Sequence, residues 1–347
     1  MRVLIANYDR FAHYYIHMGL ANAMVAAGID VVMWDIDKKP IFDAFDEFEP
    51  DVFIGQTFHV NDSIIKVIEE RPAMMVIMKA SDDGPIHDNM DHNKYPVLVA
   101  SQKEKDMMNK LIDRTGKPDF LFVHYIEDRL NETHKYWRDR GFRVESLLSG
   151  ADIISFTNGI KKPELECDIA FVGGRWGYKS QTLDKWFLPL LEQNLKIKIF
   201  GNQPWGVPQY CGFIPDQEVK NLFASAKICP NLSEPHSQVF GYDIVERPFK
   251  LLSNKCFVIS DKVEDLVKII PNGISYASTP VEFTEKIYYY LNKDEKRKDI
   301  AEKGYNAVMS GHTYFHRVAH IFDKLNRPDV SLRIMESYEE TKEKLAL

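Results

Sequence analysis

The stretch CDIAFVGGRWGYKSQTLDKWFLPLLEQNLKIKIFG, residues 167–201, decides the fold class. It begins with a short apolar run that ends in two glycines, continues as a segment whose apolar residues recur at helical spacing, and closes with a second apolar run. A strand, a tight turn, a helix and another strand form the building unit of a parallel sheet, because parallel strands need a crossover connection. We therefore expect an α/β fold in this part of the chain.

The same alternation runs through most of the sequence. Further expected strands occupy 2–7, 29–35, 50–56, 73–81, 95–101 and 119–125 in the first half, and 226–231 and 255–261 in the second. Near residues 147–166, turn formers and charges cluster without a period, which indicates a connection between domains. We therefore predict Rossmann-like domains at 1–155 and 156–322, and a helical tail at 323–347 that packs back on the N-terminal domain.

Composition limits the class of protein. The 347 residues are 45% hydrophobic and 27% charged, as in a globular protein with ample core. No run approaches the roughly 20 apolar residues of a membrane span, and the N-terminus resembles a strand more than a signal peptide, which predicts a cytoplasmic protein. The net charge of −7 argues against a general phosphate-backbone binder, although a local basic groove can coexist with it. Four widely spaced cysteines predict reduced core thiols and no zinc site.

Ligands of open α/β sheets bind beyond the carboxyl ends of the strands, so the loops there are the candidate binding segments. After the strand at 167–172, Gly173 and Gly174 permit a close approach of the backbone. Arg175 and Lys179 follow in the same strand-to-helix turn and can reach a diphosphate together. Glycines combined with two cations predict a phosphate site at this turn.

A second segment, QVFGYDIVERPFKLLSNKCFVIS at 238–260, places Glu246 and Arg247 at the start of an expected helix. Two interpretations remain open at this point. Either the helix start is an anion site at which Arg247 meets a phosphate, or both residues are solvated members of a first turn. Under the first, free backbone N–H groups and Arg247 complete a two-sided clamp with Arg175 and Lys179.

The loop at 202–216, which contains Gly212, is rich in turn formers. It can hold a base through backbone hydrogen bonds or be an ordinary surface loop.

The first half has no glycine in the loop after its first strand, so it resembles an acceptor-binding half more than a nucleotide-binding half. Its strand-end loops offer several polar residues as candidate general bases, each of which can equally be a cap or turn residue. They are Asp9, Arg10, His13, His59, Asp62, Asp82 and Asp83. Of these, Asp9, His13 and Asp82 are the first candidates.

Five segments of the second half carry a resemblance to a known family. In chain order they are GADIISF, CDIAFVGG, IKIFGNQPW with YCGFIP, ERPFKLLSNKCFVISD and YYYLNKDEKRKDIAEKGYNAVMSGHTYFHRV. With these segments, residues 150–322 resemble the CgeB-like glycosyltransferases, a group-one-related family with the GT-B fold. The first half matches only in its alternation of strands and helices.

The resemblance implies two Rossmann-like domains that face a central cleft. It implies transfer of a sugar from a nucleoside-diphosphate sugar, most readily a UDP-sugar, held mainly by the C-terminal domain. The acceptor would be a hydroxyl of a glycan, a protein or a modified DNA base. The family needs no bound metal or cofactor, so Arg175, Lys179 and Arg247 would stabilise the leaving diphosphate. A retaining reaction would need no side-chain base, whereas an inverting one would use Asp9, His13 or Asp82.

The sequence departs from the pattern of related retaining enzymes, which carry two glutamates eight residues apart. In one alignment Glu246 is the second glutamate and Gln238 replaces the first. In the other, which keeps the strand in phase and which we prefer, Lys250 replaces the glutamate and Arg247 is the family's arginine. Glu246 would then substitute in the ribose contact.

In that alignment the family's small residue and glycine before the strand are Asn254 and Lys255. The departures leave a non-catalytic nucleotide-sugar or glycan-binding protein as the alternative. The expected donor contacts are Gly173, Gly174, Arg175, Lys179, Gly212, Glu246, Arg247 and Lys250.

Overall fold

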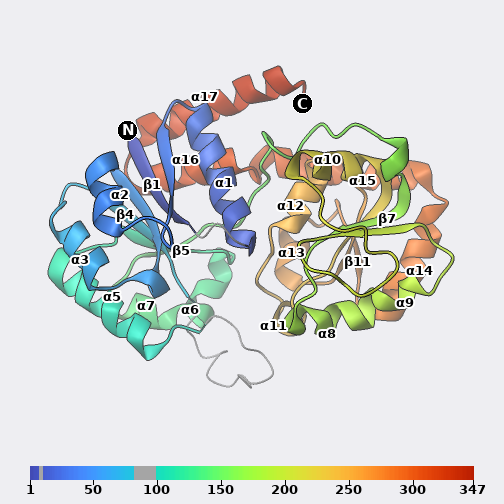
Figure 1. The fold of residues 1–347 in the computed structure, drawn as a ribbon, viewed down its shortest axis with the longest axis horizontal. Helices are drawn as coiled ribbons and strands as arrows, with labels where there is room; N and C mark the ends of the chain where they lie inside the picture. Colours follow the sequence, from blue (N-terminus) through green and yellow to red (C-terminus); the bar gives the residue numbers. More distant parts are fainter. Residues whose placement is uncertain (8–10, 82–98) are drawn as a thin grey trace. The chain divides into compact units, whose positions relative to one another are not determined.

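The computed structural model describes residues 1–7, 11–81 and 99–347 as two compact units (Figure 1). Unit 1 comprises Met1–Leu148 and Phe315–Lys342, and unit 2 comprises Ser149–Tyr314 and Glu343–Leu347. The chain therefore leaves unit 1, builds unit 2 and returns to unit 1 with its C-terminal helices. Among the described residues, no helix is both long and apolar enough to cross a bilayer.

Unit 1 is built on a six-stranded sheet in the order β2-β1-β3-β4-β5-β6, with every neighbouring pair parallel. Its strands are β1 (Arg2–Asn7), β2 (Asp30–Asp35), β3 (Val52–Gln56), β4 (Met75–Lys79), β5 (Phe120–Val123) and β6 (Val144–Ser146). The central strands β3 and β5 are buried along their whole length, as expected for parallel strands covered on both faces.

Helices pack around this sheet (Figure 1). They are α1 (Phe11–Ala26), α2 (Ile41–Phe48), α3 (Asp62–Glu69), α5 (Gln102–Thr115), α6 (Leu130–Thr133), α7 (Lys135–Asp139), α16 (Tyr314–Lys324) and α17 (Pro328–Leu345). Side-chain caps fix two of the helix starts. Asn61 accepts a hydrogen bond from the Ile64 amide at 3.0 Å, and Ser101 accepts one from Glu104 at 3.1 Å. Lys324 ties the end of α16 to β6 through Glu145, at 2.7 Å.

Unit 2 contains a five-stranded parallel sheet in the order β11-β10-β9-β7-β8. Its strands are β7 (Cys167–Val172), β8 (Ile197–Phe200), β9 (Ala226–Asn231), β10 (Val258–Asp261) and β11 (Ser275–Ala277). Its helices are α8 (Gly177–Trp186), α9 (Leu188–Leu191), α10 (Asp216–Ser225), α11 (Pro235–Phe240), α12 (Arg247–Leu252), α13 (Glu264–Ile269), α14 (Pro280–Leu291) and α15 (Asp294–Gly311).

The stretch 167–201 folds as its pattern predicts. Leu183 and Trp186 of α8, and Phe187 directly after the helix, share one apolar core with residues of β7 and β8. Register pairs Ile169 with Ile197, so the apolar faces of the two strands align. The α/β class with two parallel sheets is confirmed.

Three details differ from expectation. β6 and β11 are additional strands of three residues each, and α11 is an additional helix between the expected strand at 226–231 and the expected helix start at Glu246. Three of the four cysteines are buried as predicted, but Cys211 is exposed. Most of the strand expected at 95–101 lies outside the described residues.

Each sheet has a topological switch point, the place where successive crossovers leave in opposite directions. In unit 1 it lies between β1 and β3, and in unit 2 between β7 and β9. Because the helices on either side diverge there, the carboxyl ends of these strands leave a crevice in which α/β proteins bind ligands. These two edges are therefore the first places to examine.

Candidate functional site

Two of the predicted cations meet at the switch point of unit 2. Lys179, in α8, donates a hydrogen bond from Nζ to the carbonyl oxygen of Leu232, just after β9. Arg247, the first residue of α12, donates from Nη1 to the same oxygen at 3.3 Å. The structure thus brings together side chains that are 68 positions apart in the sequence.

Lys179 is almost fully enclosed, with 3% of its surface exposed. Its ammonium lies 3.5 Å from a carboxylate oxygen of Glu234, the residue before α11. Burial lowers the pKa of Lys179 to about 8, while the Glu234 charge opposes the shift and the Arg247 charge adds to it. A ligand anion would favour the charged form of this lysine.

Arg247 stacks over the ring of Phe171, with its guanidinium carbon 4.9 Å from the ring centroid. Its Nη2 would lie 3.0 Å from a Cβ placed on Gly173, so glycine leaves room for the guanidinium beside the turn. Burial lowers the pKa of Arg247, and the charges of Glu234, Asp261 and Glu246 oppose this. The interpretation of Arg247 as a solvated first-turn residue is therefore wrong.

A buried carboxylate holds the loop around these cations. Asp261, at the end of β10, accepts hydrogen bonds from the Ser233 amide at 2.9 Å and its hydroxyl at 3.2 Å, and from Gln238 Nε2 at 3.0 Å. Burial raises the pKa of Asp261, and the Lys179 charge lowers it. Our sequence reasoning missed Asp261, although an aspartate at the carboxyl end of a buried strand was a usable signal. Gln238, one candidate replacement for a family glutamate, thus donates its hydrogen bond to the Asp261 carboxylate.

Glu246, the residue before α12, and Lys250 within it form a second, largely enclosed charge pair. Lys250 Nζ lies 3.2 Å from Glu246 Oε2 and 4.1 Å above the Phe156 ring. The Glu246 side chain is only 9% exposed, so it too is no solvated first-turn residue. Burial raises its pKa, and Lys250 opposes the shift. Within the described part of the chain, Glu246 Oε1 is buried without a hydrogen-bond partner.

The start of α12 offers fewer free N–H groups than the sequence suggested. Pro248 has none, and the amides of Phe249 and Lys250 donate to the Glu246 carbonyl at 3.1 and 3.4 Å. Any anion binding here therefore depends on side-chain cations more than on the six-residue helix itself. Lys255, where the family has glycine, keeps a left-handed backbone with φ of 55°.

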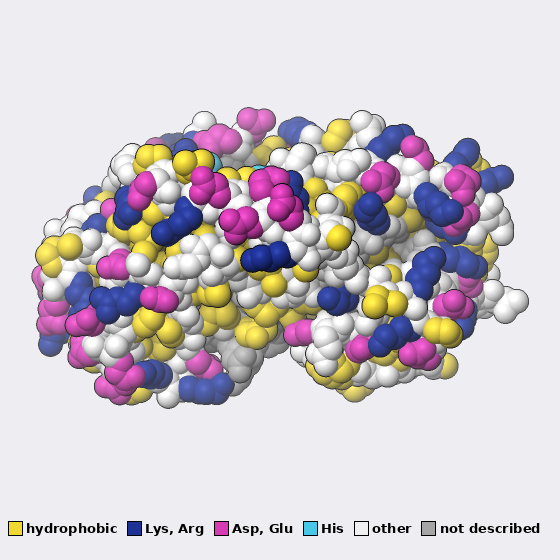
Figure 2. All heavy atoms as spheres, turned by 90° about the horizontal axis from the view of Figure 1, so that it is seen from above, with side chains coloured by type: hydrophobic (Ala, Val, Ile, Leu, Met, Phe, Trp, Pro, Cys, Tyr) yellow, Lys and Arg dark blue, Asp and Glu magenta, His cyan; other side chains and the backbone are white. Residues whose placement is uncertain are grey.

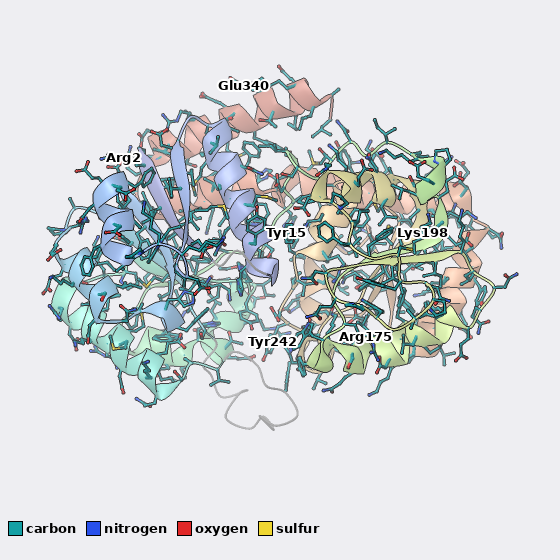
Figure 3. All side chains as sticks on the ribbon, in the orientation of Figure 1. Arg2, Tyr15, Arg175, Lys198, Tyr242 and Glu340 are labelled. Atoms are coloured by element: carbon teal, nitrogen blue, oxygen red, sulfur yellow. The ribbon has the colours of Figure 1, made fainter. Side chains whose placement is uncertain are left out.

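Arg175 takes a different direction from Lys179. Its Nη2 and Nε donate to Asp184 at 2.8 and 3.1 Å, which holds the guanidinium against α8 (Figure 3). Gly174, the second glycine of the turn, has Gln203 Oε1 3.6 Å from a Cβ built on it, an ordinary contact.

The glycines of neighbouring loops bring two strand ends together. A Cβ on Gly201, directly after β8, would lie 2.6 Å from the carbonyl oxygen of Gly173. Trp205 Nε1 donates to that same oxygen at 3.1 Å. The carbonyl of Gly212, a left-handed glycine at φ 94°, accepts from the Gly201 amide at 3.0 Å. Sequence reasoning singled out Gly212 and missed Gly201.

A hydrogen-bonded chain adjoins Lys179 and also escaped prediction. Asp243 Oδ2 lies 2.7 Å from His236 Nε2, and His236 Nδ1 lies 3.1 Å from the hydroxyl of Tyr178. The backbone amide of His236 donates to that hydroxyl as well, at 3.2 Å. These hydrogen bonds connect the first turn of α8 to α11 and so position Lys179.

The base candidates of unit 1 are only partly within the structure. Asp9, Arg10, Asp82 and Asp83 lie outside the described residues. His13 is described, on α1, with its ring centroid 6.3 Å from that of His17.

Two further candidates of unit 1 follow β3 within six residues of its end. Asp62, the first residue of α3, pairs with Lys110 at 2.6 Å on the surface. Burial lowers the pKa of His59 to about 4, so its ring is neutral near pH 7.

Comparisons with known proteins bear on the same part of the chain. Residues 179–323 match the family model described as glycosyl transferase-like. The match begins at Lys179 and includes Arg247. A search of curated protein sequences finds no significant match.

Solved glycosyltransferase structures share the fold of the whole chain. Sucrose-phosphate synthase from Thermosynechococcus elongatus has a TM-score of 0.66 at 8% identity, over 94% of this chain and 98% of its own. An α-glucosyltransferase bound to UDP and a 13-mer DNA containing an HMU base has a TM-score of 0.65 at 11% identity, over 94% and 99%. T4 phage β-glucosyltransferase with UDP and Mn²⁺ has a TM-score of 0.55 at 13% identity, over 100% of both chains.

Identities this low establish the fold alone. Residues 179–323 form a glycosyl transferase-like domain, within a chain that has the GT-B fold.

Proposed function

We propose that the protein is a metal-independent glycosyltransferase of the CgeB-like kind, which takes a sugar from a nucleoside-diphosphate sugar bound by unit 2. The observation that carries the proposal is the convergence of Lys179 and Arg247 on the Leu232 carbonyl, at the switch point of a glycosyl transferase-like domain. A UDP-sugar is the preferred donor, because two of the structural neighbours bind UDP.

The chemistry follows from the placement of charge. As the bond between sugar and diphosphate breaks, negative charge grows on the leaving diphosphate. Arg247 is always charged, and it is partly desolvated, so its attraction for that growing charge exceeds what water would allow. Lys179 adds a second cation whose protonation a bound diphosphate would favour. Protein cations of this kind can supply the stabilisation that Mg²⁺ supplies in other enzymes.

The proposed acceptor is a glycan or protein hydroxyl in preference to a DNA base. Basic and acidic side chains are interspersed on the face of each unit that Figure 2 presents. The net charge of −7 points the same way, because DNA binding draws most of its affinity from contacts between cations and phosphates. For an inverting reaction, Asp9, His13 and Asp82 remain the candidate bases.

One observation favours a second function, that of a binding protein without catalysis. Lys250 takes the place of a family glutamate and is held by Glu246 and Phe156. An enclosed ion pair at this position leaves no carboxylate in the family arrangement to bind the ribose of the donor.

The test is a thermal-shift panel of nucleoside diphosphates and their sugars, with and without EDTA, because a ligand bound only by the native state raises Tm. We expect one diphosphate series to raise Tm equally in EDTA, and chromatography to detect slow hydrolysis of its sugar. Stabilisation without hydrolysis or transfer would favour the binding protein. No stabilisation by any nucleotide would contradict the glycosyltransferase and would favour a protein that binds a glycan without catalysis. Stabilisation lost in EDTA would contradict metal independence.

A further inference from the structure

Unit 1 has its own cavity at its switch point. The cavity measures about 670 Å³, within the range of roughly 300–1,000 Å³ that small-molecule sites occupy. Ala6 near the end of β1 and Gln56 at the end of β3 both line it, so it lies over the crevice between these strands. Neither the cations of unit 2 nor the family match at 179–323 include this cavity.

The side chain of Gln56 is the first sign that the cavity takes a ligand. Gln56 is 1% exposed, and within the described part of the chain both its amide nitrogen and its amide oxygen are buried without a hydrogen-bond partner. Leaving a buried amide unpaired costs free energy that a well-packed protein normally avoids. A ligand that both donates and accepts hydrogen bonds would satisfy it.

Glu104 provides the second polar group of the lining. It is 6% exposed, and one of its carboxylate oxygens hydrogen-bonds the Thr57 hydroxyl. Its backbone amide donates a hydrogen bond to the hydroxyl of Ser101, the N-cap residue of α5, so Glu104 is fixed in the first turn of that helix. Because Glu104 lines the cavity, its carboxylate can also accept a hydrogen bond from a ligand hydroxyl.

Charge in the lining argues against an anionic ligand. Lys39 is held by Glu47, and Lys38 by Asp35 at 2.6 Å, while Lys103 lies exposed at the rim. The buried and half-buried polar groups of the lining thus include the Gln56 amide, the Glu104 carboxylate and the neutral imidazole of His59. A phosphate or carboxylate would meet the Glu104 carboxylate and, among the described residues that line the cavity, no buried lysine or arginine.

Aromatic side chains complete the lining. Trp34, Phe53 and Phe58 contribute to it, and Phe58 is 45% exposed with its ring edge-on to His59 at 4.2 Å. Apolar ring faces beside an amide and a carboxylate suit a ligand that presents C–H faces together with hydroxyl groups.

We propose that this cavity is a carbohydrate site that binds a neutral sugar, with Gln56 and Glu104 as its hydrogen-bonding groups. Naming that sugar as the acceptor rests on the proposed function, but the binding itself does not. The sugar hydroxyls donate to Glu104 and exchange hydrogen bonds with the Gln56 amide, while the aromatic rings pack on its C–H face.

The experiment uses the full chain without any nucleotide. A glycan array that carries neutral and acidic oligosaccharides, together with DNA containing hydroxymethylated pyrimidines, identifies the class, and saturation-transfer NMR with the strongest neutral oligosaccharide gives the affinity. We expect a neutral oligosaccharide to bind. Binding only to acidic glycans or only to DNA would overturn the proposal, as would no binding to any probe.

Two matched variants locate the site. Gln56→Leu keeps the side-chain volume and removes the amide, so we expect an affinity loss of about tenfold or more with no decrease in Tm. Gln102→Leu makes the same exchange at an exposed neighbour that does not line the cavity, and we expect no change. Undiminished affinity in Gln56→Leu would overturn the proposal.

The same samples separate this proposal from the proposed function. UDP should stabilise Gln56→Leu as much as wild type, because unit 2 is untouched. Carbohydrate binding without any stabilisation by nucleotides would refute the proposed function alone, and the reverse result would refute the carbohydrate site alone.

Discussion

Gly201 and Gly173 approach so closely that a Cβ on Gly201 would lie 2.6 Å from the Gly173 carbonyl oxygen, closer than real Cβ contacts come. Both residues follow adjacent parallel strands, and Trp205 donates to the same carbonyl. The turn that leads into α8, the helix of Lys179, and that leaves room for Arg247 is thus held in place by the loop after β8.

We expect Gly201→Ala to lower the free energy of unfolding by about 1–3 kcal/mol, because backbone atoms would have to shift. Urea denaturation measures the change. Gly177→Ala is the control, since nothing lies within 4 Å of its added Cβ, and it should be neutral or slightly stabilising. Equal stability of Gly201→Ala and wild type would show that the approach is not tight.

Arg247 and Arg175 should contribute very differently to binding the diphosphate of the sugar donor, although both were expected to bind it. Arg247→Ala should lower turnover about 10²–10³-fold, the usual cost of removing one donor to a developing charge. Arg175→Ala should change it little, because Asp184 already holds that guanidinium. Steady-state kinetics and UDP titration of both folded variants measure the difference. Equal losses would mean that Arg175 leaves Asp184 to bind the donor.

Lys179 predicts a pH dependence of nucleotide binding. Its pKa of about 8 in the free protein lies below the usual 10.5, so the ammonium loses its proton as pH rises through 8. A bound diphosphate favours the protonated form, and UDP affinity should therefore fall from pH 7.5 to 9.5. Calorimetric titration over this range measures the fall. Lys179→Arg keeps its charge throughout and should flatten the profile, and an equally steep profile in that variant would assign the titration to another group.

The same shift has a consequence for stability. Between pH 8 and 10.5 the unfolded lysine binds more protons than the folded one, so this residue makes the free energy of unfolding rise with pH in that window. Lys179→Arg should lack this contribution, which denaturation at pH 8 and 10 can detect.

Much of the architecture could be read from the sequence because buried parallel strands appear as continuous apolar runs. β6 and β11 have three residues each, too few to show any pattern. α11 could have been found. Pro235 in its first turn and the left-handed Gly241 after its last residue are ordinary start and stop signals.

The site was less accessible to sequence reasoning than the strands. Strand-end loops pointed to Lys179 and Arg247, but the partner of Arg175 depends on where α8 begins, since Asp184 lies nine residues further on. Gln56 showed no signal, because only the packing of unit 1 reveals that its amide is buried without a partner.

The ion pair on α12 gives a last prediction, which bears on the departure from the family pattern. Lys250→Met would leave the Glu246 carboxylate enclosed without its cation, and we expect a loss of about 2–4 kcal/mol in the free energy of unfolding at pH 8. Burial already raises the pKa of Glu246 above its usual value. A folded-state pKa above the unfolded one means that protonation favours folding, so the loss should shrink as pH falls toward 5.

Denaturant unfolding of wild type and Lys250→Met at pH 8 and pH 5 measures both effects. Adding Glu246→Gln to Lys250→Met should recover most of the stability at pH 8, because no enclosed charge remains. A loss that is independent of pH and not recovered by Glu246→Gln would assign the role of Lys250 to its packing on Phe156. In that case the main role of Lys250 would be to pack against Phe156. Its alignment with the family glutamate would then say nothing about charge at the donor site.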